Sequence, residues 1–192
     1  MAVRTDRQRR KLVQHDFSLV FEGADVHDPG NLDSWFEAGC DDATFGEVDG
    51  VGYADFTRTS ALAPEAILSA IDQLESAVPS VRVIRVEPDD LVTASDIAER
   101  LGRSRESVRL LVAGERGPGG FPPPISHLRS RGRLWRWAEV VRWAKAELDE
   151  VTSDTETPIF VAALNDALDL RRLGPEIATN RWRKVVLRLL PV

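Results

Sequence analysis

The sequence contains a single cysteine, Cys40, and only three histidines, His15, His27 and His127. One cysteine excludes an intrachain disulfide, which fits a reducing compartment. Three histidines so far apart, with one cysteine, do not make a zinc-ligand pattern, and we expect neither a metal nor a cofactor. No apolar run approaches the roughly 20 residues that span a bilayer, and no apolar stretch follows the basic first residues as in a signal peptide. We therefore expect a cytoplasmic protein that does not bind membranes.

The net charge of −6 over 192 residues is unevenly distributed. Residues 1–14 hold five Lys or Arg against one acid, and residues 15–90 hold three against seventeen. Residues 91–145 reverse the balance, with eleven Lys or Arg against five acids. A basic segment inside an acidic chain is a recognised indication of a nucleic-acid surface.

Residues 15–88 predict alternating strands and helices. The expected elements are a strand at Phe17–Phe21, a helix capped by Asn31 with Leu32, Trp35 and Phe36 on its apolar face, strands at Ala43–Val48 and Gly52–Thr59 joined by Asp49-Gly50, a helix between Pro64 and Pro79, and a strand at Val81–Val86. Asp-Gly is a strong signal for a two-residue hairpin turn. The order β-α-β-β-α-β predicts a ferredoxin-like domain.

The segment Leu91–Leu111 predicts two helices joined by a tight turn. The first helix begins near Ala94–Asp96 and buries Ile97 and Leu101, with a small residue at Ala98. Gly102 stands where the chain must reverse, because glycine tolerates a positive φ. Ser104 is expected to cap the second helix, whose inward residues are Val108 and Leu111.

Turn-forming residues and arginines follow this pair of helices. Gly117–Ile125 predicts a rigid connector, and Ser126–Trp137 predicts a β-hairpin with a basic tip. Trp135, Trp137 and Trp143 suit a stacking platform for single strands or a small core. Because they alternate along a strand and continue onto a helix, we expect at least two of them in the core.

This segment resembles the helix-turn-helix family, since Ala98, Gly102 and Val108 match its small residue, turn glycine and apolar residue. With the hairpin and a helix over 138–150, it is similar to the winged branch of MerR-type regulators and phage excisionases. In that family the second helix enters the major groove. The resemblance implies base reading by Arg105, Glu106, Ser107 and Arg109, phosphate contacts by Arg103 and Ser104, and phosphate or minor-groove contacts by Arg129, Arg131, Arg133 and Arg136. Thr93 completes the candidate DNA-binding residues.

Other chemistry-bearing residues are expected to be structural. Asp41-Asp42 and Asp89-Asp90 are adjacent carboxylates in turns, and we expect them to be solvated or to cap helices. Cys40 has no neighbouring base, and we expect a buried thiol in an apolar helix. No catalytic constellation is found, so an enzyme is not expected.

The predicted fold class is therefore α+β. It comprises a basic flexible arm (1–14), an acidic ferredoxin-like domain (15–88), a central winged helix-turn-helix (91–150) and a C-terminal helical hairpin (157–192). The hairpin consists of helices at Ile159–Leu173 and Pro175–Leu190, separated at Gly174-Pro175 because glycine ends helices and proline begins them.

We expect a sequence-specific double-stranded DNA-binding protein that acts in transcriptional regulation. It would read the major groove with residues 104–113 and contact the backbone or minor groove with residues 126–137. One alternative is an antitoxin-like or adaptor protein whose acidic domain binds a protein partner, and another is an excisionase-like factor that bends DNA. A homodimer and a small-molecule effector of the acidic domain also stay open.

Overall fold

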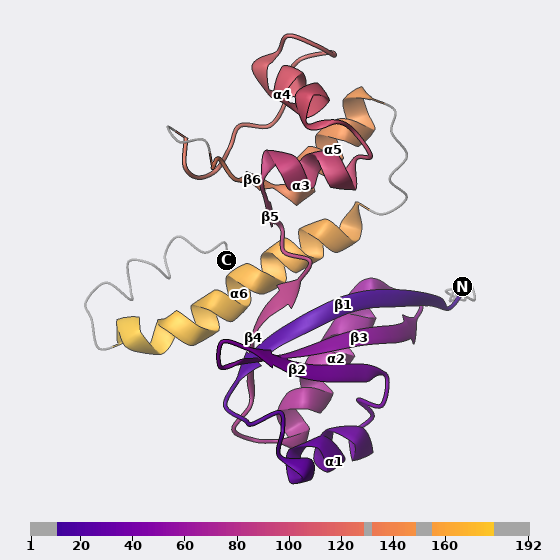
Figure 1. The fold of residues 1–192 in the computed structure, drawn as a ribbon, viewed down its shortest axis with the longest axis vertical. Helices are drawn as coiled ribbons and strands as arrows, with labels where there is room; N and C mark the ends of the chain where they lie inside the picture. The colour runs from indigo at the N-terminus through magenta and orange to yellow at the C-terminus, as the bar shows by residue number, and fades with distance from the viewer. Residues whose placement is uncertain (1–10, 129–131, 149–154, 179–192) are drawn as a thin grey trace, which may run out of the picture. The chain divides into compact units, whose positions relative to one another are not determined.

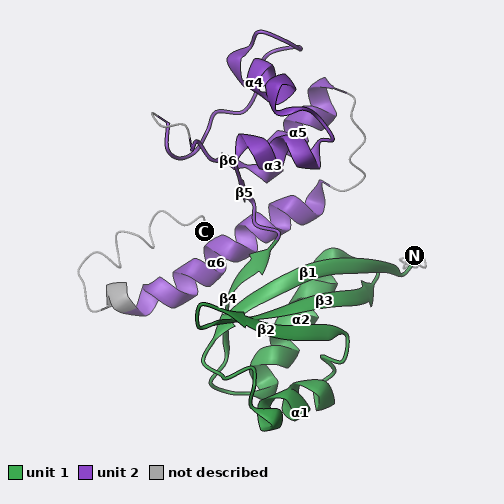
Figure 2. Ribbon diagram, viewed as in Figure 1, with its two compact units in different colours: residues 1–87 green, residues 88–192 purple. Residues whose placement is uncertain are grey.

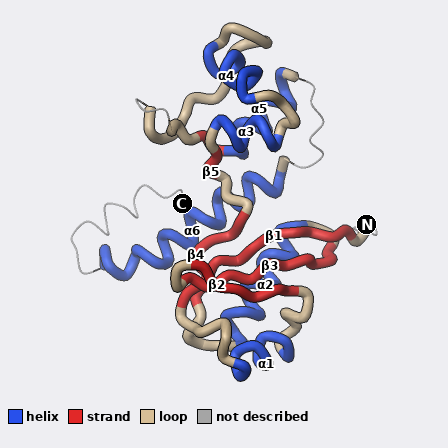
Figure 3. The backbone as a smooth tube through the Cα atoms, in the orientation of Figure 1, coloured by secondary structure: helices blue, strands red, loops and turns tan. Residues whose placement is uncertain are grey.

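A computed structural model describes residues 11–128, 132–148 and 155–178. The chain divides into two compact units, residues 1–87 (unit 1) and 88–192 (unit 2) (Figure 2). The fold is mixed α+β, with a four-stranded antiparallel sheet in unit 1 and, in unit 2, a two-stranded sheet with most of the helices (Figures 1 and 3). None of the described helices combines the length and the apolar character that a membrane crossing needs.

Unit 1 has the element order β-α-β-β-α-β. Its elements are β1 (Val13–Glu22), α1 (Pro29–Glu37), β2 (Ala43–Val48), β3 (Val51–Ser60), α2 (Ala63–Ala77) and β4 (Arg82–Glu87). The strands lie in the order β2-β3-β1-β4, and every neighbouring pair is antiparallel. This places β1 and β3, the two longest strands, in the middle of the sheet.

Alternate residues of β1 and β3 point to the covered face of the sheet. Several of them are aromatic and pack against one another in the core of unit 1. Phe17 of β1 stacks on Phe56 of β3 with ring centroids 5.3 Å apart. Trp35 of α1 meets the edge of Phe21 and stacks on Phe45 of β2, with centroids 4.6 Å apart in the stacked pair. The indole N–H of Trp35 donates to the carbonyl of Leu74 on α2, so this one side chain links both helices to the sheet.

The hairpin turn between β2 and β3 is the one that the sequence predicts. Asp49 and Gly50 both have positive φ, +52° and +82°, as a type I′ turn requires of its two central residues. Val48 and Val51 pair directly across it.

The start of α1 differs from the prediction. Asp28, not Asn31, is the N-cap, and its carboxylate accepts from the amide of Gly30. Pro29 takes the first turn, where its missing N–H costs nothing. Trp35 is buried as expected, but Phe36 is 67% exposed, so the buried face of α1 is narrower than predicted.

The predicted basic arm over residues 1–14 extends too far toward the C-terminus, because its last residues lie in a strand. Val13 and Gln14 belong to β1 and pair with Ser60 and Thr59 of β3, because β3 extends far enough to offer them backbone partners. Residues 1–10 of the arm lie outside the described residues.

Asp42 is not a solvated carboxylate as expected. Arg58 occupies an inward position of β3 and is 8% exposed, and a buried guanidinium needs acceptors. Asp42 accepts from its Nε at 2.7 Å and its Nη2 at 2.8 Å. Ser69, Gln73 and the carbonyl of Gly39 accept the remaining bonds. The position of Arg58 at an inward-facing residue of β3 could have predicted that its charge needs a buried partner.

Cys40 is buried, as predicted, but lies in the turn after α1 and not within a helix. Burial raises the pKa of its thiol to about 11, and the nearby positive charge of Arg58 only partly opposes this. A thiol with so little thiolate at neutral pH is a poor nucleophile.

Unit 2 contains β5 (Leu91–Val92), α3 (Ala94–Arg100), α4 (Arg105–Ala113), β6 (Trp135–Arg136), α5 (Trp137–Glu147) and α6 (Glu156–Ala178). The predicted break at Gly174-Pro175 is wrong, since α6 continues through both residues. Proline removes a single N–H donor, and the hydrogen bonds on either side sustain the helix. Residues 179–190 of the second predicted helix lie outside the described residues.

Candidate nucleic-acid interface

Helix α3 begins with a complete capping box at Thr93 and Asp96. The Thr93 hydroxyl accepts from the amide of Asp96, and the Asp96 carboxylate accepts from the amide of Thr93 at 2.7 Å. The backbone N–H of Thr93 holds the pKa of Asp96 below its usual value. Thr93, a candidate DNA contact, is therefore a half-buried cap whose hydroxyl is already used.

The turn between α3 and α4 forms as the sequence predicts. Gly102 has φ +61°, and the amide of Arg103 donates to the carbonyl of Ala98 at 2.8 Å. Ser104 is the N-cap of α4, and its hydroxyl accepts from the amide of Ser107. The second helix thus starts immediately after a three-residue reversal.

Both helices rest on one apolar cluster. Its buried members are Val92, Ile97, Ala98, Val108, Trp135 and Val140. Leu111, near the end of α4, joins Trp143 and Ala144 of α5 in an adjoining cluster. Because α3 and α4 each contact β6 or α5 through these residues, the opposite side of α4 is left for solvent.

The exposed side of α4 presents Arg105, Glu106 and Arg109. Glu106 accepts from the Nε and Nη2 of Arg109 at 2.9–3.1 Å, and this pairing lowers the pKa of Glu106 and raises that of Arg109. Glu115, which the sequence analysis did not single out, lies 3.6 Å from the Nη2 of Arg109. Arg103 and Ser107 are half-buried at the base of this face.

The connector after α4 is held by tryptophans. The indole N–H of Trp143 donates to the carbonyl of Gly119, and that of Trp135 donates to the carbonyl of Pro122. Phe121 packs edge-on against both rings. Trp135 and Trp143 are buried, so the prediction that at least two tryptophans lie in the core is confirmed.

The predicted hairpin over Ser126–Trp137 is much shorter than expected. Among the residues that the structure describes, a single bridge joins Ser126 to Leu134, while β6 pairs with β5 through Leu91–Arg136 and Val92–Trp135. Pro122-Pro123-Pro124 supplies no N–H, so the first arm cannot extend the ladder, and β5 provides the partner instead.

The arginines of this segment have different surroundings. Arg133 is half-buried, with its guanidinium 5.5 Å from the centroid of the Trp135 ring. Arg129 and Arg131, the basic tip, lie outside the described residues.

Arg136, a candidate DNA contact, is half-buried and pairs with carboxylates of the protein. Its Nη1 lies 3.1 Å from Asp90 and its Nη2 lies 3.1 Å from Asp166 of α6. Burial lowers the pKa of Arg136, but the hydrogen bonds to Asp166 and Asp90 raise it above its usual value. A guanidinium engaged by two carboxylates has few donors left for a phosphate.

Asp90 is a buried cap, with 3% of its surface exposed. Its Oδ1 accepts from the amide of Ala138 at 2.8 Å, and its carbonyl accepts from the amide of Trp137. The sequence predicts that Asp90 is either solvated or a cap, and the second alternative is confirmed. Asp90 thus satisfies the first amides of α5 and the Arg136 side chain together.

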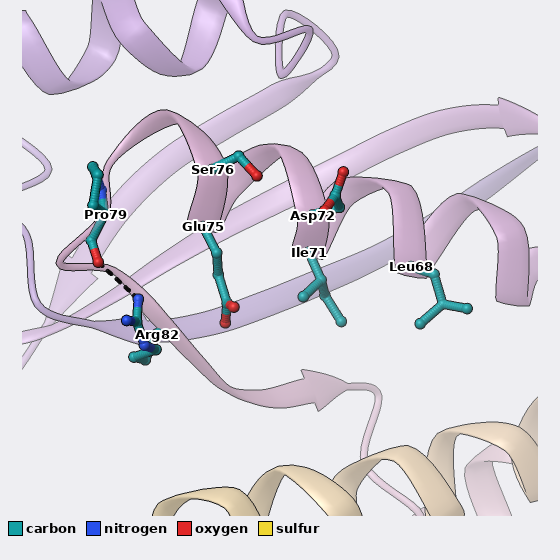
Figure 4. A pocket seen from close by; sticks show the side chains of 7 residues that line it. All are labelled: Leu68, Ile71, Asp72, Glu75, Ser76, Pro79 and Arg82. Carbon is teal, nitrogen blue, oxygen red and sulfur yellow. Dashed lines mark hydrogen bonds between the residues drawn. The ribbon is translucent and has the colours of Figure 1, made fainter.

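Unit 1 carries an open groove along α2 and β4 (Figure 4). It is lined by Leu68, Ile71, Asp72, Glu75, Ser76, Pro79 and Arg82. The guanidinium of Arg82 donates to the carbonyl of Pro79 at 2.8 Å. The Glu75 carboxylate accepts from the amide of Val83 at 2.8 Å. Carboxylates beside a guanidinium on an open surface are typical of a solvated helix face. In the described part of the chain, no three His, Cys, Asp or Glu side chains are placed to hold a metal ion.

Comparison of the chain with protein-family models, with curated protein sequences and with solved structures finds no match.

Proposed function

We propose that unit 2 is a sequence-specific double-stranded DNA-binding module and that the protein is a transcriptional regulator of the winged helix-turn-helix kind. The observation that carries the proposal is the exposed, arginine-bearing first half of α4, set by the Gly102 turn and the Ser104 cap. Helices presented in this way enter the major groove with their N-terminal residues at base edges.

The pairing of β5 with β6 supports the winged variant. A strand before the two helices pairs with the strand after the connector, and α5 follows that strand directly. Chain segment 129–131, which holds Arg129 and Arg131, leads into this strand. In the proposed complex these arginines and Arg133 contact phosphates, whereas Arg136 holds the strand.

The excess of positive charge in residues 91–145 favours DNA over a neutral partner for unit 2. Residues 91–145 hold eleven Lys or Arg against five acids, and phosphate neutralisation supplies most of the affinity of such surfaces. The acidic residues 15–90 would repel phosphates. We propose that this part, whose strand order and antiparallel pairing support a ferredoxin-like arrangement, does not contact DNA.

A mobility-shift titration of the full chain on a randomised duplex library tests the proposal. We expect a retained complex at 50 mM salt and enrichment of a defined motif after several rounds of selection. Arg109→Ala should relax specificity at one position, and Arg131→Ala should weaken binding to all sequences alike. Absence of any complex at low salt would refute the proposal.

The same material separates the remaining alternatives. An architectural, excisionase-like factor bends its site strongly, which circular-permutation mobility assays measure as a position-dependent shift. An adaptor or antitoxin-like protein would copurify with a basic partner that is lost when the acidic residues of unit 1 are neutralised.

A further inference from the structure

An ion-pair cluster consists of Glu106 and Arg109 on the exposed face of α4 and Glu115 just after its C-cap, Gly114. Glu106 engages the Nε and Nη2 of Arg109 with both carboxylate oxygens, and Glu115 lies 3.6 Å from the same Nη2. All three side chains are more than half exposed. Arg109, one of the two exposed arginines of α4, is therefore already paired, with an excess of one negative charge around it.

Guanine and the two carboxylates compete for the same nitrogen. Arginine reads guanine with two parallel N–H groups on O6 and N7, and either guanidinium fork includes Nη2. Guanine at the Nε–Nη2 fork displaces Glu106, which occupies both nitrogens, whereas guanine at the Nη1–Nη2 fork displaces Glu115. Exposed ion pairs strengthen an equilibrium by no more than about fivefold, whereas a bidentate base contact discriminates by about 5- to 150-fold. The exchange is therefore favourable at guanine and unfavourable elsewhere.

Glu106 needs a new donor when guanine takes the Nε–Nη2 fork of Arg109. In the major groove the donors are the amino groups of cytosine and adenine, and the other edges present acceptors or a methyl group. Adenine places its N7 acceptor beside its amino group, so the second carboxylate oxygen would be repelled there. The N4 amino group of cytosine has an acceptor on one side only, O6 of the paired guanine, and the C5–H on the other side, which makes cytosine the better partner.

The spacing of the two side chains sets the distance between the bases. Residues three apart on an α-helix are separated by about 4.5 Å along the axis. Successive base pairs are separated by about 3.4 Å. Glu106 and Arg109 on one face of α4 therefore match neighbouring base pairs.

We infer that Glu106 is a specificity-determining residue, which selects a cytosine in the base pair next to the guanine read by Arg109. The inference rests on the proposed function and deepens it. Glu106 weakens binding to other sequences. On such DNA it either stays paired with Arg109, which then cannot contact a base, or faces acceptors and phosphates without a donor. It lowers the affinity for unmatched DNA more than the affinity for the site.

Selection from a randomised duplex library with the full chain, followed by sequencing and fluorescence titration, tests this inference. The wild-type motif should contain a guanine with a cytosine in the adjacent base pair. Glu106→Gln should keep the guanine, lose about tenfold of the discrimination between cytosine and thymine at the neighbouring position, and bind random duplex several-fold more tightly. Glu106→Ala should relax the same position, and Arg109→Ala should relax the guanine position.

Glu99→Gln is the matched control, because Glu99 is an exposed carboxylate on α3, outside the cluster. It should leave every motif position unchanged, and circular dichroism should show that all variants are folded. If the wild-type protein enriches a motif and Glu106→Gln leaves each of its positions intact, the role of Glu106 is refuted while DNA binding stands. If the wild-type protein binds no DNA, the proposed function fails and the inference fails with it.

Discussion

Replacing Asp90 should destabilise unit 2 more than replacing any exposed carboxylate of that unit. Asp90→Ala removes the acceptor of the Ala138 amide, and Ala138 is only 7% exposed. A buried donor left without a partner costs about 1–3 kcal/mol. The change also removes one of the two carboxylates that pair with Arg136, whose side chain is 30% exposed, and leaves the pair with Asp166. Together these losses amount to about 2–4 kcal/mol, a large share of a typical stability of about 5–15 kcal/mol.

Asp90→Asn separates the two contributions. The amide oxygen can still accept from Ala138, but the charge opposite Arg136 is lost, so we expect about 1–2 kcal/mol. Asp166→Ala is the control, because the Asp166 side chain is 65% exposed and exposed ion pairs contribute about 0–1 kcal/mol. Urea titrations of the full chain give the free energies, and hydrogen exchange at the Ala138 amide shows whether the loss is local. Equal stability of Asp90→Ala and Asp166→Ala would contradict the reasoning.

Arg58→Met should cost unit 1 about 3–5 kcal/mol in urea titrations, because it leaves Asp42 without its buried partner; a loss below 1 kcal/mol would contradict this. Cys40, with a pKa of about 11, should react with a disulfide reagent at pH 8 at least about 100-fold more slowly than a free thiol, and should react at the ordinary rate only after unfolding. The pKa of Asp96 is lowered in the folded state. Its contribution to the free energy of unfolding is therefore fully present above the unfolded pKa of about 3.9 and is lost as the pH falls through the lower folded pKa. The difference in stability between wild type and Asp96→Asn should shrink below about pH 4 and stay constant above about pH 5. DNA affinity should fall about 500-fold between 50 and 200 mM salt if about five phosphates are neutralised, and Arg105→Ala should make that dependence shallower if Arg105 neutralises one of them.

Local signals in the sequence predicted the elements whose residues interact with near neighbours. Asp49-Gly50, Pro64, Gly102 and Ser104 each act within a turn of their own position, and the structure has the expected hairpin, helix start, reversal and cap. The alternation of apolar residues in β1 and β3 likewise depends only on the period of a strand. These features follow from backbone conformation and need no knowledge of the rest of the chain.

The features that sequence analysis missed depend on partners distant in the chain. Asp90 and Arg136 are 46 residues apart. The residues around Arg136 do not indicate this pairing, so the sequence led to the prediction that Arg136 contacts DNA. The pairing of β6 with β5 was missed for the same reason. In contrast, Arg58 was predictable as a buried ion, since its register on β3 points inward; only its partner Asp42 was not.

The C-terminal helix α6 belongs to the same unit as the candidate interface and not to a separate hairpin. Asn165 of α6 is 4% exposed, and its side-chain amide lies within hydrogen-bond distance of the carboxylate of Asp89. Its neighbour Asp166 binds Arg136 of β6. The residue pair Asp89-Asp90 thus contacts α6, β6 and the first turn of α5 at once. A fragment that ends before α6 would expose Asp89 and remove one partner of Arg136 on β6. Tests of the proposed DNA binding therefore use the full chain, because weaker binding by such a fragment would not separate loss of this support from loss of a DNA contact.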